Sequence, residues 1–259
     1  MSETPAGSRP LSPLSRDDLP TVLALGLLAA AMTTTAHEAV GHGGFCLLHG
    51  GRITQLTSVY FQCKPAMDGV AAAGPIGNLT AALIAWLIRR MVPAAHARLR
   101  LLLVFVTAFS LFWEAGYVIH AMIHDEGDWV FAARELFGRP EQPWRIGGIV
   151  LGIILYAVGI LAMRRAMRPY ERVGALLRWG WLAGSTGAVI ASLAYTKDHA
   201  AIGQAALEVG AASWPMILLS FRIPTDQSAP AITRSWAWIG AAVILYAVFV
   251  ATLGRGLAF

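Results

Sequence analysis

Long hydrophobic runs, separated by short polar segments, dominate this chain after its first 20 residues. The runs are continuous and lack the alternation of a half-buried strand, so they favour helices. Several contain roughly 20 residues with few charges, which is the length that an α-helix needs to cross a bilayer. Because lipid offers no partners to backbone groups, a spanning segment must form a helix or part of a closed barrel. The pattern therefore predicts an all-α, polytopic integral membrane protein.

We expect six or seven transmembrane helices. One segment, residues 202–219, contains Glu208 and Pro215, so it either crosses the membrane or lies partly in the interface. Between the first two spans, residues 52–61 are rich in β-branched side chains and predict a short strand or hairpin at the membrane edge. The expected spans are residues 22–48, 70–91, 101–123, 146–163, 176–195, 202–219 and 236–253.

The chain divides into three parts. Residues 1–20 are polar and form an N-terminal tail, and no cleavable signal is evident because the first hydrophobic run begins late and is long. Residues 21–138 contain three spans and most of the ionisable residues that fall inside spans. Residues 139–259 contain the C-terminal transmembrane helices. We therefore look for chemistry in the three-span core.

Composition and charge agree with a membrane location. The chain is 56% hydrophobic and 14% charged, whereas soluble domains have about a quarter charged residues. The net charge of +5 comes mainly from arginines at the ends of hydrophobic runs. This placement excludes nucleic acid as a partner and indicates that the protein's partner is the lipid bilayer. Arginine-rich turns face the cytoplasm. We therefore expect a multi-pass protein of the plasma or inner membrane whose N-terminus lies in the cytoplasm.

The two cysteines, Cys46 and Cys63, flank a short loop after the first span. In an oxidising compartment they would form a disulfide; otherwise they are two free thiols in apolar surroundings. Their spacing is not that of a metal site.

The first span contains His37, Glu38 and His42. Ionisable residues are costly in a membrane, so such a group is a candidate functional site. A catalytic zinc site uses three protein ligands and leaves one position open, and a nearby glutamate serves as general base. The two histidines are candidate ligands and Glu38 the candidate base, with a third ligand from elsewhere. The alternative is a buried polar cluster without metal.

The spacing of the two histidines requires a distorted helix. Positions five residues apart differ by about 140° around a regular α-helix, so His37 and His42 would not share a face. A π-bulge realigns them, and such bulges often mark functional sites. Gly41 makes the distortion easier. We therefore predict a π-helical turn here.

Three pieces of the core resemble the membrane-embedded metalloproteases of the site-2 protease class, peptidase family M50. They are His37-Glu38-Ala39-Val40-Gly41-His42 followed by Gly50-Gly51-Arg52, then Ala73-Gly74-Pro75-Ile76-Gly77-Asn78, and a Gly-Asp element at residues 127–128. Members carry His-Glu-x-x-His, a Gly-Pro-x-x-Asn segment and a metal-binding Asp beside Gly on successive helices. The resemblance covers residues 30 to 135.

The resemblance implies zinc as the cofactor and hydrolysis of peptide bonds in or beside membrane segments of a protein substrate. It makes His37, His42 and Asp128 the metal ligands and Glu38 the base. It places Asn78, together with Gly74 and Pro75 of the same segment, at the substrate. These assignments are expectations taken from the family.

The chain departs from the family in three respects. Its His-Glu-x-x-x-His is one residue longer and resembles that of dipeptidyl peptidase III, whose third ligand is a later glutamate; Glu114 is thus an alternative ligand. Gly127 precedes Asp128 where the family has glycine after the aspartate, so Asp125 is also an alternative, and Asp128 would then cap a helix. The arginines place this site nearer the outer face, whereas the family's sites lie nearer the cytoplasm.

Two other functions remain open from the sequence. His120 and His124 are four residues apart on one helix face, and with the first-span cluster they would form an iron site. The protein would then resemble the histidine-rich membrane desaturases and hydroxylases, although those carry more histidines than the 7 of this chain. The second alternative is a non-catalytic M50-like membrane protein.

Overall fold

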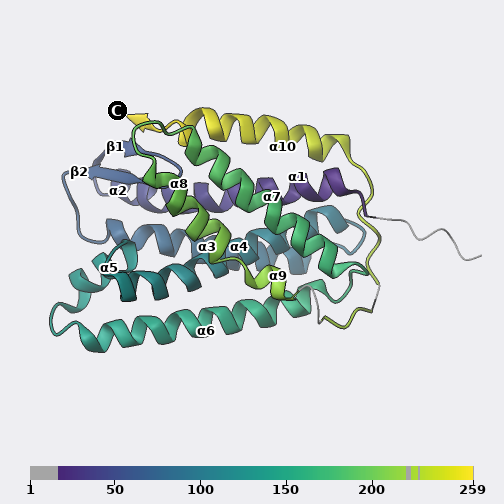
Figure 1. Cartoon of the computed structure of the whole chain (residues 1–259), viewed down its shortest axis with the longest axis horizontal. Helices are drawn as coiled ribbons and strands as arrows, with labels where there is room; N and C mark the ends of the chain where they lie inside the picture. Colours follow the sequence, from purple (N-terminus) through teal and green to yellow (C-terminus); the bar gives the residue numbers. More distant parts are fainter. Residues whose placement is uncertain (1–16, 220–222, 227, 259) are drawn as a thin grey trace, which may run out of the picture.

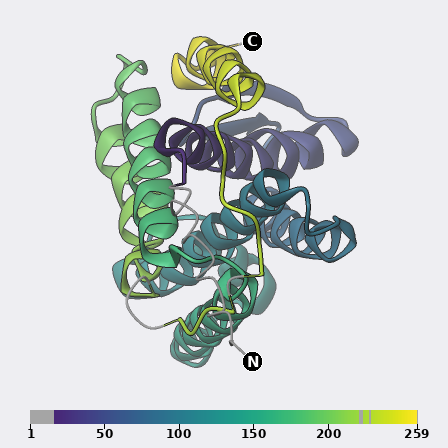
Figure 2. The same cartoon turned by 90° about the vertical axis from the view of Figure 1, so that its right-hand side faces the viewer.

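The computed structural model describes residues 17–219, 223–226 and 228–258, so most of the predicted N-terminal tail, residues 1–16, lies outside the described residues. The helices lie side by side in one bundle (Figure 1), and Figure 2 looks along it. Six helical segments are long and apolar enough to cross a membrane. The prediction of an all-α, polytopic membrane protein is confirmed.

Helical elements make up most of the part of the chain that the structure describes. The helices of the first half are α1 (Leu19–Thr35), η1 (Ala36–Gly43), α2 (Gly44–Leu48), α3 (Val70–Met91), α4 (Ala97–His124) and α5 (Asp128–Phe137). Those of the second half are α6 (Gln142–Met167), α7 (Val173–Leu193), α8 (Ala200–Ala205), η2 (Ala206–Ala211), α9 (Pro215–Leu219), α10 (Trp236–Phe249) and η3 (Val250–Gly254).

Two expected spans need comment. Residues Ala200–Leu219 form a 20-residue segment that meets the length and hydropathy required of a span, so residues 202–219 belong to a candidate span. Helix α7 forms where the span 176–195 was predicted, but it is not among the six candidate spans.

Helix α4 forms the centre of the bundle. It is the most buried of the six candidate spans and packs against α1, α3 and α6. Its aromatic side chains Phe105, Phe109, Phe112 and Trp113 are completely buried. Because protein interiors are close-packed, these side chains hold the surrounding helices at fixed positions. The side chains that α4 presents to η1 and α5 therefore rest on a rigid support.

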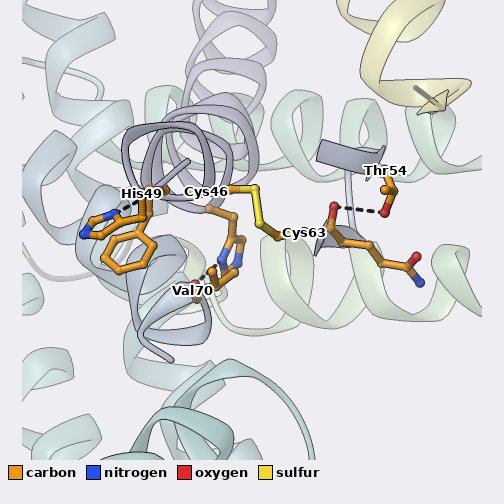
Figure 3. The surroundings of a disulfide bond; sticks show 8 residues. Cys46, His49, Thr54, Cys63 and Val70 are labelled. Atoms are coloured by element: carbon orange, nitrogen blue, oxygen red, sulfur yellow. Dashed lines mark hydrogen bonds between the residues drawn. A yellow bond between two sulfur atoms is a disulfide. The ribbon is translucent and has the colours of Figure 1, made fainter. Parts of the chain in front are cut away.

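A small sheet covers one end of the bundle. Strand β1 (Arg52–Leu56) lies between β2 (Phe61–Lys64) and β3 (Leu257–Ala258), antiparallel to both. The predicted strand or hairpin at residues 52–61 is thus confirmed. A disulfide joins Cys46 of α2 to Cys63 of β2, which decides between the two alternatives for the cysteines (Figure 3). It fixes β2 beside the end of the first span.

Candidate metal centre

A π-helical segment, η1, interrupts the first span at the His-Glu cluster. It confirms the turn predicted from the five-residue spacing, because i→i+5 hydrogen bonds widen the turn and bring His37 and His42 to one face. The two imidazole rings lie edge to face, with centroids 4.9 Å apart. Both side chains are buried, at 2% and 4% exposure. The local sequence thus produces a two-histidine pair.

Asp128 completes the group from the first turn of α5. Its Oδ2 lies 3.1 Å from His37 Nε2 and 3.2 Å from His42 Nε2. The alternative role of Asp128 as a helix cap is wrong: Gly127 is the N-cap, and no side-chain cap hydrogen bond forms there.

The hydrogen bonds behind the histidines determine which nitrogen faces Asp128. His42 Nδ1 donates to the Val70 carbonyl at 2.7 Å, and His37 Nδ1 lies 3.1 Å from Glu114 Oε1. With the proton on Nδ1, each Nε2 directs a lone pair at the Asp128 carboxylate. Three lone-pair donors that converge within 4.8 Å repel one another unless a cation lies between them. The set therefore fits a metal ion that prefers nitrogen and oxygen ligands.

Glu114 supports His37 and does not join the ligand group. This carboxylate is completely buried. Besides its contact with His37, it accepts hydrogen bonds from Asn78 Nδ2 and Trp129 Nε1, both at 2.8 Å. His37 also stacks on Trp113, with 4.8 Å between ring centroids. Such outer partners fix the orientation of a metal-binding imidazole.

Segment 73–78 of α3 packs against the ligand pair. A Cβ added at Gly74 would stand 2.6 Å from His37 Nε2 and nearer still to His42 Nε2. Gly74 thus leaves the space in which the ligands converge. Pro75 has no N–H group, so it leaves the Ala71 carbonyl without its helical donor, and Ala71 lines the cavity described below. Asn78 is buried behind His37, and its role at a substrate stays a prediction.

The other candidate ligands lie outside the triad. Asp125 forms ion pairs with Arg134 and Arg145. His120 Nε2 lies 3.1 Å from Glu126 Oε1, and the ring of His124 lies against that of His120. Among the described residues, His37, His42 and Asp128 are the only three such side chains placed to share a metal ion. The iron site expected to combine His120 and His124 with the first-span cluster is not assembled.

A cavity of about 790 Å³ opens onto the triad. Glu38 lines it beside the two histidines. This glutamate is 3% exposed, and its Oε2 has no hydrogen-bond partner in the part of the chain that the structure describes. A buried carboxylate oxygen without a partner is costly, so Glu38 is available to a water molecule or substrate in the cavity. This is the arrangement that a general base requires.

The sequence did not predict a role at the site for two residues that line the cavity, Tyr117 and Glu208. Tyr117 accepts a hydrogen bond from the Asp128 backbone N–H at 3.0 Å and donates to Asp128 Oδ2 at 3.3 Å. Glu208 of η2 reaches the same cavity from the C-terminal half of the chain. Glu208 could have been identified as a candidate site residue because it is an ionisable residue inside an expected span. Nothing in the sequence distinguishes Tyr117 from other tyrosines.

The chain matches no family model, no curated protein and no solved structure. What the site does must therefore be inferred from its own geometry.

Proposed function

We propose that this protein is a zinc-dependent intramembrane metalloprotease that hydrolyses peptide bonds in or beside membrane segments. The observation that carries the proposal is the convergence of His37, His42 and Asp128 next to the unpartnered carboxylate of Glu38, in a cavity at one end of a membrane bundle. The order of the three sequence pieces that resemble the M50 family supports it. The donor set of two nitrogens and one oxygen is one that zinc prefers.

The residues of the site have distinct tasks in this reaction. When bound, zinc supplies Lewis-acid chemistry, which polarises the peptide carbonyl and activates water. Glu38 accepts a proton from the water while the oxygen of this water bonds to the carbonyl carbon. Glu38 then gives this proton to the nitrogen that leaves when the C–N bond breaks. Glu114 holds His37 in place from behind the cavity, and Tyr117 holds Asp128 in place from the cavity wall.

Strand β2 is suited to hold an extended substrate. Strand β1 is the middle strand of the sheet, so among the described strands β2 offers an outer edge next to the site. Phe61, Gln62 and Cys63 of β2 line the cavity. An extended peptide that adds to this edge would lie across the cavity. If proline in place of Gln62 left cleavage unchanged, this part of the proposal would be withdrawn.

The proposed orientation places the site at the outer face. The arginine-rich turns that follow α3 and α6 lie at the end of the bundle opposite the disulfide. Positive turns favour the cytoplasm, and disulfides persist in oxidising compartments. The N-terminus would then be cytoplasmic. Alkaline phosphatase is active only outside the cytoplasm. A fusion of this enzyme to the N-terminus is therefore expected to be inactive.

Metal content is the direct test of the proposal. Elemental mass spectrometry of the detergent-purified protein is expected to find about one zinc per chain, and a double variant with His37→Ala and His42→Ala is expected to lose it. The Glu38→Gln variant should keep the zinc and lose peptide cleavage. Iron in place of zinc would favour the oxidoreductase, and no metal after zinc had been offered would favour a non-catalytic protein.

A further inference from the structure

The cavity that contains the metal centre has acidic walls. Besides Glu38 and Asp128, four carboxylates line it from four different segments of the chain, and no lysine or arginine is among the described lining residues. The four are Glu126 after α4, Glu135 of α5, Asp198 before α8 and Glu208 of η2. The triad and a divalent ion carry a net positive charge that Glu38 balances. Of the four remaining carboxylates, Glu126 lies beside the imidazole of His120, and the other three have no lysine or arginine partner among the described lining residues.

Glu208 differs from the other three. Glu126, Glu135 and Asp198 are exposed, whereas Glu208 is 4% exposed and lies in a segment long and apolar enough to cross the membrane. Its one hydrogen-bond partner in the described structure is neutral, Gln204 Nε2 at 2.6 Å. A carboxylate inside a span is expensive, and such groups pair with a cation or mark a substrate path. Among the described residues that line this cavity, no lysine or arginine is available for the pairing.

A second observation indicates that a ligand occupies the cavity. Glu38 is also buried, and its Oε2 lacks a partner among the described residues although it lines the same space. Two buried carboxylates therefore face one cavity from spans far apart in the sequence. One is explained by the reaction proposed above. The other, Glu208, has no task in that reaction.

We propose that Glu208 is a specificity residue that binds a cationic group of the peptide substrate, a lysine or arginine side chain or an amino terminus, near the bond to be cleaved. The inference rests on the proposed function, because it treats the ligand of this cavity as a peptide. The exposed carboxylates around the cavity, Glu126, Glu135 and Asp198, attract the same cationic group on its way in. The substrate class is thus basic peptide segments, and acidic ones are repelled.

Peptide binding tests this inference separately from catalysis. The probes are three fluorescently labelled decapeptides of alanine and serine that differ only in a central lysine, glutamine or glutamate. Their affinities for the zinc-loaded protein in detergent are measured by fluorescence anisotropy. The lysine peptide is expected to bind about tenfold more tightly than the glutamine peptide, as a charge-assisted hydrogen bond allows. The glutamate peptide should bind most weakly.

The variants assign the preference to one residue. Glu208→Gln should remove most of the preference for lysine, while Glu208→Asp retains part of it. Glu171→Gln, an equal change of charge at an exposed turn between α6 and α7, should leave the preference intact. Equal binding of the lysine and glutamine peptides, or an undiminished preference in Glu208→Gln, would overturn the inference. Because binding needs no cleavage, a protein that prefers lysine but cleaves nothing refutes the protease proposal alone.

Discussion

Replacing Gly74 with alanine tests the metal centre without replacing any of the proposed ligands. The new Cβ would stand 2.6 Å from His37 Nε2 and closer to His42 Nε2. Non-bonded atoms prefer separations of about 3.5 Å, so the rings would have to retreat by roughly 1 Å. They have little room, because His37 is stacked on Trp113 and held by Glu114. The methyl group therefore occupies the space in which the ligand atoms meet.

The expected consequence is a large loss of zinc affinity. Metal–ligand distances tolerate errors of only about 0.2 Å, and disturbing the groups that merely orient ligands already costs about 10–100-fold. We expect Gly74→Ala to weaken zinc binding by about 100-fold or more. Affinity is measured in detergent by competition with a chromogenic zinc chelator.

A matched variant controls for the effect of alanine in a membrane helix. Gly147 lies in α6, where an added Cβ would meet no atom within 4 Å. Gly147→Ala should bind zinc like the unchanged protein. If Gly74→Ala also bound zinc with unchanged affinity while keeping its fold, the two histidines and Asp128 would not form the metal site, and the argument from their geometry would fail.

Three further predictions use the same purified protein. Glu114→Gln should weaken zinc binding by about 10–100-fold because it loosens a ligand, and Trp129→Phe, which removes one donor to Glu114, should cost less; an unaffected Glu114→Gln would contradict the positioning role. Tyr117→Phe should lower zinc affinity by about tenfold in the same competition assay, since it releases Asp128, the third proposed ligand; no change would leave that hydroxyl without a role. Joint Cys46→Ser and Cys63→Ser substitution should lower the melting temperature, through the loss of about 3 kcal/mol for a loop of this length; an unchanged melting temperature would refute it.

The sequence by itself determined the membrane architecture and the distortion of the first span. Hydropathy acts locally, so runs of apolar residues identify spans wherever they pack in the bundle. The π-helical segment was also predictable, because a five-residue spacing and a 3.6-residue turn cannot place His37 and His42 on one face. Both results depend on neighbouring residues alone.

Tertiary structure decided which distant residues meet the two histidines. The resemblance favoured Asp128, but Glu114 inside the third span and Asp125 just after it were alternative ligands from the sequence. Packing of α5 across the end of α4 brings the Asp128 carboxylate to both imidazoles and leaves Glu114 behind one of them. Packing of the C-terminal spans likewise places Glu208 in the cavity. Contacts of this kind depend on how helices far apart in the chain pack together, and local sequence patterns do not predict that packing.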